Sequence, residues 1–263
     1  MQKITAKPIV VKIGGSMMDD EVALQGLCSA LTQLHHSGLP LVLVHGGGKD
    51  INRHLAWLQE TPVFKNGLRV TSLPALKVVE MTLSGFVNKK LVSLLNLNKG
   101  NAVGLSGVDG NTFLCEQISA ELGQVGTIVS VNIALVETLL RTKFLPVVSP
   151  ISVDEKQNHF NVNADDAAAA LAIALAADKL LFVSDVEGVR GADGNKISDL
   201  DESSIAVLIE DGTASGGMIP KLNSCLAAVK KGIGQVHICG WAGSDQFSEQ
   251  VLGVKNSGTI IYG

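Results

Sequence analysis

The sequence predicts an α/β fold, a three-layer αβα sandwich around a mostly parallel open sheet. Short apolar runs alternate with helical patterns along the chain, which is typical of a parallel sheet covered on both faces. The first two runs, Ile9 to Ile13 and Leu41 to Val44, each end in glycines, as buried strands do before a tight turn. The chain has 263 residues, of which 46% are hydrophobic and 17% charged, so it can bury a large core. We expect one continuous domain.

The first half of the chain follows this alternation up to a region of different character. The expected elements are a helix capped by Asp19 or Asp20 and running to about 36, a strand over 41–44, a helix after Gly48, a long helix over 74–96 and a strand over 102–105. Residues 107–124 are rich in turn and β-forming residues, so we expect hairpins at an edge of the sheet.

The second half returns to the parallel theme. The expected elements are a helix over 132–142, a strand over 144–148, a hairpin over 151–161 that turns near 154–158, an alanine-rich helix over 164–177, a strand over 180–185 and a helix over 202–210. A Gly/Ser-rich loop then delivers Lys221 to the first turn of another helix.

Charge and hydropathy exclude several classes of partner. The net charge is −4 and no basic run exceeds two residues, so we expect no nucleic-acid partner. Apolar stretches are interrupted before the roughly 20 residues that a bilayer requires, and residues 1–8 are too short and polar for a signal peptide. We therefore expect a cytoplasmic protein without a membrane partner.

Four cysteines stand far apart, without the spacing of a metal site. They are Cys28, Cys115, Cys225 and Cys239. No CxxC pair or Cys/His ligand pattern occurs, so we interpret them as buried thiols and expect no protein-bound metal.

Glycines and two lysines indicate phosphate chemistry. The strand-end glycines 14–15 and 46–48 leave backbone amides bare, which suits anion binding. Lys12 is a cation inside an apolar strand, which is costly unless an anion lies beside it. Lys221 opposes the dipole of the helix that it starts, which also suggests an anion to neutralise. Together these features predict phosphoryl transfer.

Each feature also has a structural explanation. Glycine turns end many strands, a strand lysine can snorkel to solvent, and Asn161 and Asn163 can be turn formers with Asp165 as a helix cap. The co-occurrence of all of them favours the functional interpretation. The motif GxxxxGK[ST], an H-R-D catalytic loop and D-F-G are all absent from the sequence, which excludes a P-loop enzyme and a protein kinase.

Six motifs carry a resemblance that spans essentially the whole chain. They are Lys-Ile-Gly-Gly-Ser at 12–16, Val-His-Gly-Gly-Gly at 44–48, Lys-Asn-Gly-Leu-Arg-Val-Thr at 65–71, Asn-Val-Asn-Ala-Asp at 161–165, Ser-Asp-Val-Glu-Gly-Val at 184–189 and Gly-Gly-Met-Ile-Pro-Lys at 216–221. With these motifs the chain resembles the amino acid kinase family. The third and fourth motifs resemble its acetylglutamate kinase branch and the close aminoadipate relatives.

The resemblance implies that ATP, with Mg²⁺ bound to the nucleotide, phosphorylates the side-chain carboxylate of N-acetyl-L-glutamate in arginine biosynthesis. The acceptor carboxylate is ionised at pH 7, so the reaction needs no general base. By the same resemblance Lys12 and Lys221 would neutralise the transferring phosphoryl group, while Asp165 would hold both lysines in position. Arg69 would bind the α-carboxylate of the substrate in a two-pronged contact, and Asn161 would hydrogen-bond its N-acetylamino backbone.

The resemblance also implies where the remaining groups bind. Amides of Gly14, Gly15, Gly47 and Gly48 would contact the phosphoryl oxygens and the substrate. An amino-acid-binding lobe would span about 1–177 and a nucleotide-binding lobe about 178–263. The nucleotide contacts in the second lobe would be Ser184, Asp185, Val186, Glu187, Gly188, Val189, Arg190, Ile209, Glu210 and Asp211.

Assembly and regulation follow from the same resemblance. Arginine-inhibited relatives carry an N-terminal helical extension that the early position of Lys12 excludes here, so we expect an arginine-insensitive homodimer. The long helix over 74–96 is a candidate for the dimer surface, although burial within one chain also explains its apolar face.

Two other functions remain open at this stage. One is a kinase of a carrier-bound aminoadipate derivative, which a basic substrate groove would favour. The other is a non-catalytic, arginine-binding domain of the kind that precedes an acetyltransferase, which lacks the full set of lysines. Both Lys12 and Lys221 are present here, and about 40 residues follow the second, which argues against that domain.

Overall fold

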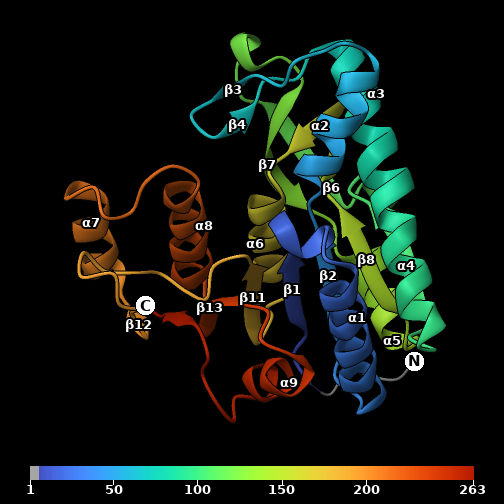
Figure 1. The fold of residues 1–263 in the computed structure, drawn as a ribbon. Coiled ribbons are helices and arrows are strands. Elements are labelled where there is room, and N and C mark those ends of the chain that lie inside the picture. The colour runs from blue at the N-terminus through green and yellow to red at the C-terminus, as the bar shows by residue number, and fades with distance from the viewer. Residues whose placement is uncertain (1–5) are drawn as a thin grey trace.

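An eight-stranded sheet forms the centre of the molecule in a computed structural model, which describes residues 6–263, with residues 15 and 16 described in their backbone only (Figure 1). In spatial order its strands are β12 (Asp199–Leu200), β14 (Thr259–Ile261), β13 (Gln235–Gly240), β11 (Lys179–Ser184), β1 (Ile9–Ile13), β2 (Leu41–His45), β8 (Leu145–Ser149) and β5 (Ala102–Ser106). Neighbouring strands run parallel except for β13 and β14. The predicted αβα sandwich with a mostly parallel sheet is confirmed.

Helices cover both faces of this sheet. Successive side chains of β1 point to opposite faces, and apolar side chains lie on both, so both faces need a cover. Ile9, Val11 and Ile13 pack with one set of helices, whereas Val10 packs with the other. The first set is α1 (Glu21–His36), α4 (Asn88–Leu97) and α9 (Ser244–Leu252), and the second is α5 (Ala134–Arg141), α6 (Ala164–Ala174), α7 (Glu202–Glu210) and α8 (Met218–Lys230). Lys12 alternates with its neighbours, so it belongs to the face of Val10, which α6 and α8 cover.

The predicted long helix is one continuous rod of three sections. They are α3 (Leu73–Glu80), a π-helical segment η2 (Met81–Val87) and α4 (Asn88–Leu97). Ser72 caps the start by accepting a hydrogen bond from the Ala75 amide. Next to α3 lies α2 (Gly48–Trp57), which begins directly after the second glycine turn.

Residues 107–124 contribute to an antiparallel hairpin as predicted, but that hairpin belongs to a separate closed barrel, so the predicted place at an edge of the sheet is wrong. Its strands are β6 (Phe113–Gln117), β7 (Val125–Val131), β9 (Ile151–Val153) and β10 (His159–Val162). The hairpin expected over 151–161 supplies β9 and β10, and their pairing with β6 and β7 closes the ring. Closure pairs both outer strands, which leaves no edge to add to the main sheet.

A short hairpin projects at one end of the molecule, above this barrel (Figure 1). It joins β3 (Phe64–Lys65) to β4 (Leu68–Arg69) through Asn66 and Gly67, whose φ angles are 52° and 80°. Two positive φ values in an Asn-Gly pair give the tight turn that matches the twist of a hairpin. A Cβ built on Gly67 would lie 3.7 Å from Pro220 Cγ, so the hairpin tip reaches the first turn of α8.

Most predicted elements lie within a few residues of their expected bounds. Asp20 caps α1, and the alanine-rich helix ends at Ala174 because Ala176 adopts a left-handed conformation with φ 47°. All four cysteines are buried and free, as predicted. Within residues 6–263, we find no helix that combines the length and the apolarity needed to span a membrane.

Candidate functional site

A carboxylate shared by two lysines lies at the centre of the candidate site. Lys12 Nζ lies 2.6 Å from Asp165 Oδ1, and Lys221 Nζ donates to Asp165 Oδ2 at 2.7 Å. The three side chains are only 12–15% exposed, so water screens the cluster weakly. β1, α6 and α8 each supply one member, from positions far apart in the sequence.

The local structure around Lys12, Asp165 and Lys221 directs the three side chains toward one another. Lys12 pairs in register with Phe182 of β11, and Lys221 Nζ lies 5.2 Å from the centre of the Phe182 ring. Asp165 stands in the first turn of α6, where the helix dipole favours a negative charge. The alternative with Asp165 as the helix cap is wrong, because Asn163 Oδ1 accepts the amide hydrogen bond from Asp165 at 2.7 Å. The carboxylate of Asp165 is therefore free to meet the lysines.

Burial and neighbouring charges set the ionisation of this cluster. Burial by itself would raise the pKa of Asp165, but the charges of Lys12 and Lys221 and their hydrogen bonds outweigh it and lower the pKa to about 2. Burial and the nearby charge of Lys221 lower the pKa of Lys12 below its usual value, although Asp165 opposes that shift. One net positive charge remains on the ionised cluster, which suits an incoming anion.

Two glycine turns lie beside the cluster. The Gly46 amide donates to the Ile13 carbonyl at 3.0 Å, so the ends of β1 and β2 are joined. A Cβ on Gly14 would lie 2.8 Å from Lys12 Nζ, and a Cβ on Gly47 would lie 2.8 Å from Leu83 Cδ2. Only glycine fits at either position without displacing a neighbour. Gly15 begins the 3₁₀ turn Gly15–Met18, and Gly47 precedes α2, whose first amides have no partner within the helix.

Arg69 offers a buried guanidinium with donors to spare. Its side chain packs 4.8 Å above the Phe64 ring, and its Nη2 donates to the Gly48 carbonyl at 3.2 Å. Nη1 is buried and has no partner among the described residues. An orphaned charged donor is costly, so this geometry suits an anionic ligand that would complete it. Burial lowers the pKa of Arg69 without removing its charge at neutral pH.

Asn161 connects to Arg69 through one buried hydroxyl. Asn161 Nδ2 donates to Thr71 Oγ1 at 3.2 Å, and that hydroxyl donates to the Arg69 carbonyl at 2.9 Å. Gly48 and Arg69 are in contact through the bond described above, which brings the predicted substrate-binding residues into one neighbourhood.

The predicted nucleotide-binding residues lie in two segments, one that follows β11 and one at the end of α7. Ser184 ends β11 beside Gly240, and Asp185 lies close enough to Lys12 to favour its charge. Val186 is exposed, and Glu187 and Arg190 approach each other on the exposed loop after β11. Gly188 and Val189 lie against Thr259. The remaining three residues, Ile209, Glu210 and Asp211, lie at the end of α7.

Sequence reasoning missed several residues that support the site. They are His45, Thr71, Asn88, Asn163 as the helix cap, and Ser224, which donates to Asp166 Oδ1 at 2.5 Å and ties α8 to α6. His45 lies within the Val-His-Gly-Gly-Gly motif at 44–48, so the sequence already indicated its position beside the glycine turn. The partners of Asn88 and Ser224 are remote in sequence and gave no signal.

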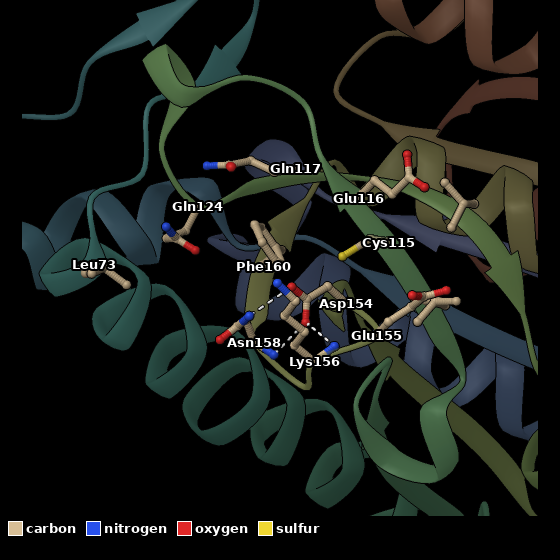
Figure 2. A pocket seen from close by; sticks show the side chains of 12 residues that line it. Leu73, Cys115, Glu116, Gln117, Gln124, Asp154, Glu155, Lys156, Asn158 and Phe160 are labelled. Carbon is tan, nitrogen blue, oxygen red and sulfur yellow. Dashed lines mark hydrogen bonds between the residues drawn. The ribbon is translucent and has the colours of Figure 1, made fainter.

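A hollow of about 590 Å³ lies on the barrel, away from the lysines (Figure 2). Its walls are Leu73, Leu114, Cys115, Glu116, Gln117, Gln124, Val129, Asp154, Glu155, Lys156, Asn158 and Phe160. Asp154 already accepts hydrogen bonds from the Lys156 amide and from Asn158, as the dashed lines show. None of the predicted site residues lines this hollow. In the described part of the chain, no group of three or more His, Cys, Asp or Glu could hold a metal ion.

Comparison with known proteins identifies the family. The model of the amino acid kinase family matches residues 7–240. An acetylglutamate kinase of Chlorobaculum tepidum is 42% identical over 241 residues, covering 90% of this chain and 84% of that protein. One of Campylobacter hominis is 40% identical over 239 residues, covering 90% and 84%. The crystal structure of smu.665 from Streptococcus mutans UA159 covers 97% of this chain and 98% of that chain, with 30% identity and a TM-score of 0.85. The chain belongs to the amino acid kinase family.

Proposed function

We propose that this protein is a kinase that transfers the γ-phosphoryl group of MgATP to the side-chain carboxylate of N-acetyl-L-glutamate, a reaction of arginine biosynthesis. The observation that carries this proposal is the bridge of Asp165 between Lys12 and Lys221. The similarity to acetylglutamate kinases over 90% of the chain supports the choice of acceptor.

The proposed step needs no proton transfer. A carboxylate oxygen of the acceptor forms a bond to the γ-phosphorus, and the bond from that phosphorus to the β,γ-bridging oxygen breaks. The products are N-acetyl-L-glutamyl 5-phosphate and ADP. Because the nucleophile is already ionised, the protein has only to align the two anions and to neutralise charge on the transferring group.

The two lysines would supply that neutralisation. Negative charge spreads over the phosphoryl oxygens in the transition state, and a preorganised cation in a site with little water stabilises it strongly. Asp165 holds Lys12 and Lys221 in place before the substrates arrive, and its charge favours the protonated form of Lys12. Amides of Gly14, Gly15, Gly47 and Gly48 would add donors on the side of β1 and β2.

Arg69 and Asn161 would bind the acceptor. The unpartnered Nη1 of Arg69 gives the α-carboxylate a buried, charged donor, and the β3–β4 hairpin would cover it. Asn161 would contact the N-acetylamino backbone. In this proposal, acceptor binding belongs to the lobe of about 1–177.

The nucleotide would lie on the lobe of about 178–263. The segment Ser184 to Arg190 begins at the C-terminal end of β11, where ligands bind in parallel sheets. The end of α7, from Ile209 to Asp211, would complete this side. Mg²⁺ would arrive on the phosphate oxygens of ATP, since Asp165, the carboxylate at the centre of the site, is already held by the two lysines.

Trapping the acyl phosphate tests the proposal. MgATP and hydroxylamine are incubated with the protein and one acceptor at a time, namely N-acetyl-L-glutamate, glutamate, aspartate or N-acetylaspartate. We expect hydroxamate and equimolar ADP with N-acetyl-L-glutamate alone. No hydroxamate with any of the four, despite measurable binding of the nucleotide, would refute the proposal and favour a carrier-bound acceptor or a non-catalytic role.

A further inference from the structure

His45 is a buried ring beside the glycine turn, and no step of the proposed reaction uses it. It ends β2 directly before Gly46, and its side chain is 0% exposed. Its Nδ1 lies 2.9 Å from the Gly46 carbonyl oxygen, and its Nε2 lies 3.1 Å from Asn88 Nδ2. One ring nitrogen thus contacts the turn, and the other contacts the start of α4.

The surrounding hydrogen bonds fix the tautomer of this ring. Asn88 Nδ2 also donates to the Val147 carbonyl at 2.9 Å, while Asn88 Oδ1 accepts from Lys89 Nζ at 2.9 Å. These partners fix the orientation of the Asn88 amide, so Nε2 of His45 must accept. A carbonyl can only accept, so Nδ1 must carry the proton and donate to Gly46.

The ring is held in its neutral form. Burial lowers the pKa of His45 to about 4, against the effect of the hydrogen bond to Gly46. The charges of Lys12 and Lys89 lower it further, because both lie near the ring. The Nδ1–H donor is therefore present in the same form throughout the neutral pH range.

Holding the Gly46 carbonyl also sets the direction of the next amide. The described chain has no cis peptide bonds, and the C=O and N–H of a trans peptide point in opposite directions. With its carbonyl drawn toward His45, the Gly46–Gly47 peptide turns the Gly47 N–H away from the ring. The Gly46 N–H is bonded to Ile13, so the turn is held on two sides. A glycine pair without such restraints would sample many conformations.

We propose that His45, supported by Asn88, is a positioning residue that aims the Gly47 N–H at an anionic oxygen of the transferring phosphoryl group. This inference rests on the proposed function, which gives the Gly47 amide its role. His45 acts through the peptide that it holds and touches no substrate.

Two variants that both carry a side-chain amide test the proposed role of His45. In His45→Asn the side-chain amide nitrogen is as many bonds from Cβ as Nδ1, so the variant keeps the donor to Gly46. In His45→Gln the amide nitrogen corresponds to Nε2, so that donor is lost although the volume is closer to that of histidine. We expect His45→Gln to lower kcat about 10²-fold, because a displacement of catalytic groups by about 1 Å has an effect of that size. Both KM values should change much less. His45→Asn should stay within about fivefold of the wild-type kcat even though its smaller side chain lowers Tm more.

A role in packing alone predicts the reverse order, with His45→Gln the more active variant. Equal kcat values for the two variants, or a higher value for His45→Gln, would overturn the inference. Nitrogen-15 NMR of the wild-type ring at pH 6–8 gives an independent readout, for which we expect protonated Nδ1 and unprotonated Nε2. The opposite tautomer would also overturn it. The NMR measurement needs no turnover, and a wild-type protein that forms no hydroxamate would refute the proposed function instead.

Discussion

Asp165 faces two ammonium groups across distances of 2.6 and 2.7 Å, which makes it the residue on which the geometry of the site depends. A buried carboxylate without partners would take up a proton. Two buried lysines without a carboxylate between them would repel each other. The two lysines therefore keep Asp165 ionised, and Asp165 in turn favours the charge of Lys12. At the residue scale, the site is a set of mutually dependent ionisations rather than three independent side chains.

Lys221→Ala should lower kcat about 10²- to 10³-fold, with little change in KM for N-acetyl-L-glutamate, because the lysine acts on charge that develops in the transition state. Steady-state kinetics with coupled ADP detection measures this. The matched control is Lys230→Ala, which removes an exposed lysine of the same helix and should leave kcat unchanged. An unchanged kcat in Lys221→Ala with a raised KM would contradict the role.

Arg69→Lys should mainly raise KM for N-acetyl-L-glutamate, by about tenfold or more, because a lysine cannot form the two-pronged contact with a carboxylate. KM for MgATP should stay near the wild-type value. Arg53→Lys is the control, since Arg53 is 57% exposed and pairs with Asp50 of α2 and with Asp19 in the turn before α1, away from the acceptor contacts proposed for Arg69. If KM for the acceptor does not change, the α-carboxylate is held elsewhere.

At the scale of elements, short helices and turns present the reactive groups. The cap at Asn163 starts α6 so that Asp165 falls in its first turn, and Ser224 fastens α8 to α6 through Asp166. The relation between Lys221 and Asp165 thus depends on a contact one turn further along α8. Glycine turns at the ends of β1 and β2 then bring backbone amides to the same edge of the sheet.

Asn163→Ala should lower both stability and kcat. Loss of a helix cap costs about 1 kcal/mol, and α6 would start less regularly beside the lysines. Asp201→Ala removes the cap of α7, where the Asp201 side chain accepts the Ser204 amide at 2.8 Å. Urea unfolding should give similar losses for the two variants, whereas kcat should fall only in Asn163→Ala. Equal kcat values would show that the cap does not position Asp165.

At the scale of the whole molecule, one sheet joins the two proposed lobes. β1 pairs with β2 on one side and with β11 on the other, so the acceptor half and the nucleotide half share a continuous core. The ion cluster lies across this junction, with Lys12 and Asp165 from one half and Lys221 from the other. Its ionisation therefore couples the stability of the fold to pH.

Acid should remove a part of the stability that Asp165 supplies. Its pKa in the folded protein is about 2, below the value of about 3.9 in an unfolded chain, so the folded state favours the ionised form. This stabilisation, on the order of 2 kcal/mol, is fully present above about pH 4 and is lost as the pH falls toward 2. Urea unfolding of wild type and Asp165→Asn between pH 6 and 3 measures it. The difference between them should narrow below pH 4, and a constant difference would contradict the coupling.

We also expect the protein to form a homodimer in solution. The rod of α3, η2 and α4 carries exposed apolar side chains, among them Met81 at 65% and Phe86 at 51% exposure. Light scattering should give twice the mass of one chain. Phe86→Asp should shift the equilibrium toward monomers, whereas Val22→Asp, on the exposed side of α1, should not. A monomeric wild-type protein at micromolar concentration would contradict this expectation.

The sequence by itself determined the layers of the fold and predicted the chemistry proposed for the site. Alternating strand and helix patterns predicted the parallel sheet, and the glycine turns with Lys12 and Lys221 predicted phosphoryl transfer, because these signals are local. The tertiary structure alone decided that residues 107–124 join a closed barrel and that His45 is linked to Asn88. Those features depend on pairing between segments far apart in the chain, and hydrophobic periodicity carries no information about such partners. The buried, unpartnered Nη1 of Arg69 belongs with them, since burial of one atom is fixed only when the hairpin, α2 and the barrel are packed together.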